Sequence, residues 1–221
     1  MNINTIYSEF KIPKNLQRHM LRVAALGRYL CDNWMVKVDK QSVVSALLLH
    51  DMGNLLKFNF NIGLGLFDED ERDIEYWESV QAKMVKEYGA EEHQATNLMA
   101  KTAGADVRTL YLIEHSGSAN LQTAIDSTDN ELKIVTYSDF RVGPHGYIGV
   151  KARFTDIIDR YQGGNHVLGD VKKTLEKRDL CLLLETQIQN NLITNVNKLP
   201  EAELEEGTKT LTNWEIKHIK H

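Results

Sequence analysis

Ionisable side chains occur at four positions in segments that otherwise have the pattern of buried helices. His19 and Asp139 each lie on the apolar stripe of a predicted helix, and the adjacent His50 and Asp51 end a third, almost wholly apolar segment. A buried charged group is costly unless it is paired, neutralised or bound to a metal. Imidazole nitrogens and carboxylate oxygens that converge from three helices form a site for a divalent cation, and such a site explains all four residues together.

Each of these residues, taken alone, also has a simpler interpretation. An inward-facing histidine is more often a hydrogen-bonded core residue than a metal ligand, and Asp139 can pair with an arginine. The His50-Asp51 pair is more informative, because neighbouring residues of a helix point about 100° apart. Both can reach one cluster only at a helix end or kink, and Gly53 provides such an end.

The segments that carry these residues have helical periodicity. Apolar residues recur at steps of three and four from Leu16 to Leu30, and His19 falls on the same face. Residues 43–51 are apolar on all sides until the last two, which predicts a buried helix with a polar end. Asp129 is among the candidate N-caps, and Gly89, Gly143-Pro144 and Gly163-Gly164 are among the residues expected to end helices. With these signals, further helices are predicted over 77–88, 90–104, 105–115, 130–142, 150–161 and 167–191.

The pattern as a whole predicts an all-α fold, because no segment shows a convincing strand alternation. A chain of 221 residues is long enough for one sizeable core. Residues 1–195 are predicted to form the domain, and 196–221 a C-terminal extension that is either docked or flexible. Residues 54–70, which contain glycines and several phenylalanines, are predicted to be a loop.

Composition limits the partners and the compartment. The net charge of −5 argues against an extended nucleic-acid-binding surface, although a small basic pocket for one phosphate is compatible with it. Residues 1–12 lack the features of a signal peptide, and no apolar run approaches the ~20 residues that span a bilayer. Cys31 and Cys181 are interpreted as free thiols in a reducing environment. We therefore expect a cytoplasmic protein without a membrane span, and the sequence leaves its oligomeric state open.

Three of the segments resemble the motifs of the HD superfamily of metal-dependent phosphohydrolases. The stretch Ala46-Leu-Leu-Leu-His-Asp-Met-Gly53 resembles the central motif. The surroundings of His19 resemble the first helix, and Tyr137-Ser-Asp-Phe-Arg-Val142 resembles the last motif of many small bacterial and archaeal members. The resemblance spans roughly residues 14–161. It implies an HD-domain helical bundle with a metal site between core helices, in which His19, His50, Asp51 and Asp139 are ligands.

The resemblance also raises the possibility of a second metal. Members with two ions have two more histidines between the central and last motifs, and this sequence offers His93 and His115, with Asp51 as the bridge. The simpler interpretation is that both are surface residues on polar helices. The sequence departs from many members at Asn54, where they have Lys, and at Ser116, where they have His. It also lacks the Gly-Tyr-Pro element of the cyclic-dinucleotide branch, which argues against cyclic-di-GMP as the substrate.

The resemblance implies hydrolysis of a phosphate ester, such as a nucleotide or another small phosphorylated metabolite, by metal-activated water. His50 and Asp51 would be the catalytic residues, with one or two ions of Mn, Fe, Co, Ni or Zn. Two alternatives stay open: a di-iron oxygenase acting on a small phosphonate or polyol, and a non-catalytic nucleotide-binding module. The candidate phosphate-binding residues, each of which is alternatively a surface charge, are Arg18, Lys57, Arg141 and Arg153.

Overall fold

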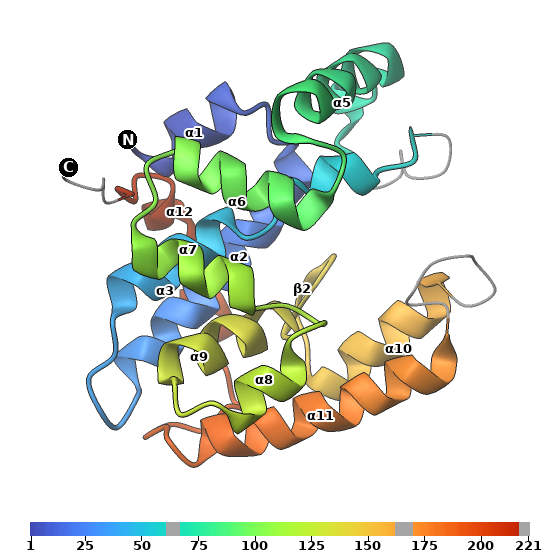
Figure 1. Cartoon of the computed structure of the whole chain (residues 1–221). Coiled ribbons are helices and arrows are strands. Elements are labelled where there is room, and N and C mark those ends of the chain that lie inside the picture. The colour runs from blue at the N-terminus through green and yellow to red at the C-terminus, as the bar shows by residue number, and fades with distance from the viewer. Residues whose placement is uncertain (61–66, 162–169, 217–221) are drawn as a thin grey trace.

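The computed structural model describes residues 1–60, 67–161 and 170–216 (Figure 1). These residues form helices around one apolar core, with a single short hairpin, and the prediction of an all-α fold is confirmed. The helices are α1 (Ile3–Glu9), α2 (Lys14–Asp32), α3 (Lys40–Leu49), α5 (Ile74–Tyr88), α6 (Glu92–Thr102), α7 (Val107–His115), α8 (Leu121–Asp126), α9 (Asn130–Asp139), α10 (Val150–Tyr161), α11 (Val171–Gln189) and α12 (Glu201–Leu211), with 3-10 turns η1 (Asn54–Lys57) and η3 (Glu69–Glu71).

The centre of the core is formed by α2, α3 and α9, which pack against one another. The apolar stripe of α2 is buried as its periodicity predicts, and every residue of α3 from Ser42 to Leu49 is buried. Gly27 allows the close contact between the two helices, because a Cβ at this position would lie 2.1 Å from Cδ1 of Leu47. This contact fixes the end of α3, which carries His50 and Asp51, beside the first turns of α2.

The end of α3 is also held from the other side, by α6. The amide of Gly53 donates to Oγ1 of Thr96 at 3.0 Å, and a Cβ on Gly53 would lie 2.6 Å from the carbonyl oxygen of Glu92. Only a residue without a side chain fits this contact. The helix predicted over residues 43–51 ends two residues earlier, at Leu49, and His50 and Asp51 lie in the turn that follows, which Gly53 packs against α6.

The predicted helix over residues 130–142 is shorter in the structure. Asp129 caps its N-terminus by accepting from the amide of Leu132 at 3.0 Å, but α9 ends at Asp139. Val142 instead begins β1 (Val142–Gly143), which pairs in antiparallel register with β2 (Gly146–Tyr147). The expectation of no strand is wrong here, because strands of two residues are too short to show an alternating pattern.

The C-terminal half covers the core. In Figure 1, α10 and α11 lie side by side. Helix α11 begins within four residues of its predicted start, while Gly163-Gly164 lies outside the described residues. Part of the predicted loop over 54–70 forms η1 and η3, and residues 61–66 are outside the description.

The C-terminal segment is docked. Helix α12 packs on α2, where Nε of Arg22 lies 2.7 Å from Oε1 of Glu205, and a β-bridge joins Asn2 to Glu215. The division of the chain at residue 195 stays a prediction. Within the described ranges, no helix combines the length and apolar character that crossing a bilayer requires.

Candidate metal centre

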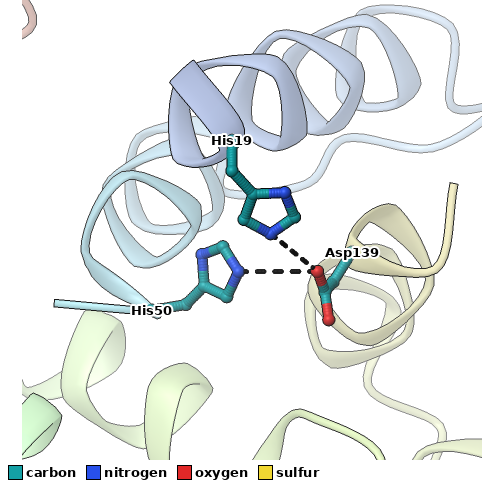
Figure 2. Close-up of side chains that lie close together, drawn as sticks. All are labelled: His19, His50 and Asp139. Atoms are coloured by element: carbon teal, nitrogen blue, oxygen red, sulfur yellow. Dashed lines mark hydrogen bonds and ion pairs between the residues drawn. The ribbon is translucent and has the colours of Figure 1, made fainter. Parts of the chain in front are cut away.

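Three of the predicted ligands meet in one cluster (Figure 2). His19 comes from α2, His50 directly follows α3, and Asp139 is the last residue of α9. Oδ1 of Asp139 lies 3.0 Å from Nε2 of His19 and 3.7 Å from Nε2 of His50. One ligand atom from each residue lies within 4.8 Å of the other two, so that the three atoms can bind one ion.

Asp51 lies beside this cluster. Its Oδ2 atom is 3.6 Å from Nε2 of His19 and 3.7 Å from Nε2 of His50. The side-chain amide of Asn54 donates to the same oxygen at 3.2 Å and orients the carboxylate. Asp51 therefore adds a carboxylate oxygen beside the two imidazoles, and Asn54 orients it from the position where the family motif often has Lys.

The orientation of His50 prepares it for ligation. Its Nδ1 lies 2.8 Å from the carbonyl oxygen of Leu47. Because a carbonyl only accepts, Nδ1 must donate, and in the neutral ring this leaves a lone pair on Nε2. Nε2 is buried, faces the cluster and has no hydrogen-bond partner among the described residues.

Two carboxylates determine the protonation of His50 in the absence of a metal. Burial lowers the pKa of His50, but the negative charges of Asp51 and Asp139 outweigh burial and raise this pKa to about 9. Burial likewise raises the pKa of Asp139, and its interactions with His19 and His50 hold it well below the usual value. In the metal-free protein a proton therefore provides the positive charge that the carboxylates require.

The donor set fits a divalent transition metal. Two imidazole nitrogens and two carboxylates, without a thiolate, suit Mn, Fe, Co, Ni or Zn better than Mg or Ca. The orphaned Nε2 of His50 is explained by an ion at this position, since a buried polar atom without a partner is otherwise rare. The residues present thus fit the metal that the cluster implies.

The two histidines predicted for a second metal have different positions. His93 lines the same cavity as the cluster, but its Nε2 lies 3.1 Å from the carbonyl oxygen of Glu114. His115 stacks on Tyr111 and its Nδ1 lies 2.9 Å from the carbonyl oxygen of that residue. His115 lines a different groove, between α6 and α7, and Ser116 reaches the cavity instead. The structure therefore does not bring His115 to the cluster.

Two cavities meet at the cluster. The first, of 420 Å³, contains the four predicted ligands of the first metal together with Lys57 and Lys177. The second, of 440 Å³, lies toward the hairpin and contains Arg18. Both volumes are within the ordinary range for small-molecule sites. The residues common to both are His19, Asp51, Asn54, Arg153 and Ile157.

Three of the four predicted phosphate-binding residues line these cavities. Arg18 forms a two-bond ion pair with Asp68, with both distances 2.7 Å, and Lys57 lies 2.6 Å from Oε2 of Glu92. Arg153 has one guanidinium nitrogen 3.2 Å from Asp156, but its Nε is buried without a partner. Arg153 is therefore the residue of the three that lines both cavities and has a donor without a hydrogen-bond partner among the described residues.

The prediction that Arg141 binds phosphate is wrong. Arg141 is buried, and its guanidinium donates to the carbonyls of Ile148 and Val196, to the hydroxyl of Tyr137 and to the carboxylate of Glu185. It lines neither cavity. The chain turns after α9 ends at Asp139, so Arg141 points into the core behind the helix. Its proximity to Asp139 in the sequence does not indicate proximity to the site.

Sequence reasoning missed several cavity residues. Lys177, on α11, reaches the cavity of the metal cluster, and Arg22, Arg160 and His145 line the second cavity. A cation on the apolar stripe of a helix would have been a signal, but α11 has no clean apolar face. The position of Lys177 depends on how α11 packs, which a single sequence does not reveal.

The comparison with known families agrees with this site. The model of the HD domain family matches residues 16–140, which is more than half of the chain. The chain belongs to the HD domain family, whose members are generally metal-dependent phosphohydrolases. No curated protein and no solved structure matches the chain. The matched region includes the three residues of the cluster and Asp51 and ends one residue after Asp139, so α10 and α11 lie outside it.

Proposed function

We propose that this protein hydrolyses a phosphate ester of a small metabolite, such as a nucleotide, with a divalent transition metal held by His19, His50 and Asp139. One observation carries the proposal: Nε2 of His50 is buried, unpartnered and directed at two carboxylates within an HD domain. A core histidine that serves only packing would have both ring nitrogens satisfied or exposed.

When bound, a divalent ion would make hydroxide available at neutral pH, since it lowers the pKa of water from ~15.7 toward ~7, and would offset the negative charge of the phosphoryl group. The protein supplies the rest. Asn54 holds the Asp51 carboxylate beside both imidazoles, where it can accept the proton of the attacking water. The hydrogen bond from Nδ1 of His50 to Leu47 keeps that ring in the ligating orientation.

Cations in the cavity would bind the phosphate. Arg153 lines both cavities where they meet, and its buried Nε has no hydrogen-bond partner among the described residues, so its guanidinium is the one we propose for a phosphoryl group placed at the metal cluster. Lys57 contributes positive charge but is engaged by Glu92. The cavity volume of 420 Å³ suits a small metabolite rather than a polymer.

The position of His115 favours hydrolysis over the di-iron oxygenase. An oxygenase of this type requires a full set of ligands for two irons, and His115 lines a separate groove. The two activities are distinguishable: phosphate release without oxygen in the presence of Mn supports hydrolysis, and oxygen uptake with Fe supports oxygenation.

The direct test combines metal analysis of the purified protein with an anaerobic screen of nucleotides and other phosphate esters. Asp51→Asn keeps the size of the side chain and removes its charge, so we expect near-complete loss of hydrolysis in a protein that stays folded. The metal-free variant should melt at a lower temperature at neutral pH, because Asp51 no longer stabilises the protonated His50. Asp179→Asn, at an exposed position of α11, is the matched control and should keep full activity. Wild-type turnover by Asp51→Asn would contradict the proposal.

A further inference from the structure

Lys177 lines the cavity of the metal cluster and has no carboxylate partner within residues 1–60, 67–161 and 170–216. It is half-buried on α11 and lines the same cavity as His19, His50 and Asp139. Its Nζ donates to Oγ of Ser118 at 3.4 Å, near the limit of a hydrogen bond, and no ion pair joins it to any described residue. A lysine ammonium has three donors, so most of its capacity is open.

The other cations around the two cavities differ in this respect. Arg18 is bound by Asp68, Arg22 by Glu205 and Lys57 by Glu92. Arg153 and Arg160 both pair with Asp156, and the buried Nε of Arg153 has no hydrogen-bond partner among the described residues. Among the described lysines and arginines that line the two cavities, Lys177 is thus the one without a carboxylate partner.

The wall next to Lys177 is built for a polar ligand. It consists of the turn between α7 and α8, residues 116–120, which contains two serines, a glycine, an alanine and an asparagine and no acidic residue. Gly117 has a φ of 89°, and no atom lies within 4 Å of the position of a Cβ there, so the space above it is open. Asn120 fixes the turn by donating to the carbonyl of Ser116 at 3.0 Å. The wall therefore consists of small, uncharged residues.

We propose that Lys177 and Ser118 form a second anion subsite, and that the substrate has an acidic group, phosphate or carboxylate, besides the phosphate that is hydrolysed. The proposal rests on the proposed function for the position of the first phosphate, which the metal cluster and Arg153 would bind. The second acidic group would lie against the 116–120 turn and accept from Nζ of Lys177 and Oγ of Ser118. A single-phosphate ester would leave Lys177 without an anion.

Neither Lys177 nor Arg153 lies in the part of the chain that matches the family. The matched residues provide the metal ligands and the 116–120 turn, whereas the cations come from the helices that follow. The subsite is thus a property of how α10 and α11 of this chain close the cavity. In this proposal the subsite selects among phosphate esters, whereas the metal ligands are responsible for the hydrolysis itself.

The test measures binding of inert probes by calorimetry in the presence of Mn²⁺. The probes are carboxyalkylphosphonates of increasing chain length, alkyl bisphosphonates of the same lengths, and the matching alkylphosphonates that lack the second acid. We expect the best carboxylate or bisphosphonate probe to bind the wild type about 10-fold to 100-fold more tightly than its single-acid match. The better of the two series identifies the second acid.

Lys177→Met should bring the affinity of the double-acid probe close to that of its single-acid match. Lys172→Met, on the same helix but exposed, is the matched control and should keep the preference. Ser118→Ala should reduce the preference by a smaller factor. Equal binding of both probe types by the wild type, or a preference that persists in Lys177→Met, would overturn the subsite.

The subsite and the proposed function fail in different ways. If the protein binds no metal and cleaves no ester, the proposed function is wrong, but a preference for double-acid probes that depends on Lys177 still establishes the subsite. If esters are cleaved and that preference is absent, the subsite is wrong and the hydrolase stands. Circular dichroism of each variant confirms that it is folded before binding is measured.

Discussion

Two clusters of charged residues lie within a few residues of each other at the end of α9, and they differ in how well they are satisfied. Around Asp139, two carboxylates share two imidazoles, and the buried Nε2 of His50 has no hydrogen-bond partner among the described residues. Around Arg141, the guanidinium donates to two carbonyls, a hydroxyl and the carboxylate of Glu185. Both clusters are polar groups in the core. The first is incomplete without a ligand and the second is complete.

Burial does not distinguish the two clusters, because both lie in the core. What distinguishes the binding site from the structural ion pair is whether every polar group already has a partner. A complete network fixes packing and has no capacity for a ligand, whereas an incomplete one retains unfavourable free energy that an ion can relieve. Replacing residues in the two clusters should therefore affect different properties: metal content in one and folding free energy in the other.

The largest effect is expected at Asp139. Asp139→Asn keeps the shape but removes a ligand charge, and the metal affinity should fall by more than the 10–100-fold that is typical when a residue merely orients a ligand. Phosphate-ester hydrolysis should be lost with it. Metal content after dialysis, measured by mass spectrometry, tests this. Full metal occupancy in a folded Asp139→Asn protein would remove Asp139 from the site.

A large effect on stability is expected at Arg141. Arg141→Met removes a buried guanidinium and leaves the partly buried carboxylate of Glu185 with the Tyr137 hydroxyl but without its cation, and should reduce the free energy of unfolding by about 3 kcal/mol. The double variant Arg141→Met, Glu185→Leu should recover much of this loss, because both charges are then removed. Urea denaturation gives both values. The amount of metal bound per folded molecule should be unchanged. If a folded Arg141→Met protein lost metal, the Arg141 cluster would be shown to support the metal cluster, and the two would not be independent.

The pH dependence of the metal-free protein should reflect the incomplete cluster. The pKa of His50 is about 9 in the folded state, above its ordinary value of 6.5. Its contribution to stability is therefore fully present below pH ~6.5 and is lost as the pH rises through about 9. Urea denaturation at a series of pH values should show this decline. In Asp139→Asn the decline should shift to lower pH, because one of the charges that raise the pKa is absent.

The smallest effect is expected at Arg18. Its pair with Asp68 is well formed but half-exposed, and such pairs contribute at most about 1 kcal/mol. Arg18→Gln and Asp68→Asn should each change the free energy of unfolding by less than this, with metal content unchanged. A loss of several kcal/mol would show that this ion pair resembles the Arg141 cluster.

The sequence predicts the helices and the metal cluster because both depend on local patterns. His19 and Asp139 stand out on apolar stripes, and His50 with Asp51 stands out at the end of a fully apolar helix. The direction of each side chain follows from its position on its own helix. Convergence of the three helices was then the simplest explanation of their buried charges.

The misplaced residues depend on contacts that a single sequence does not encode. Arg141 follows the end of α9, and its direction is set by the turn into β1 rather than by helical periodicity. His115 lies one turn after Tyr111 and stacks on it, so its ring faces away from the cavity. Lys177 depends on the packing of α11, a helix without a distinct apolar side. In each case the position is determined by tertiary contacts.

The docking of α12 on α2 has a consequence for how the protein folds. Arg22 and Glu205 are separated by 183 positions, so the helix that carries His19 acquires part of its packing from the far end of the chain. In thermodynamic terms, closing so long a loop is inexpensive, since each doubling of loop length costs only about 0.6 kcal/mol. In kinetic terms, contacts of such separation slow the search for the native state. Helices α2, α3 and α9 can associate earlier, whereas the outer surface of α2 remains open to misassociation until the chain is long enough for α12 to reach it.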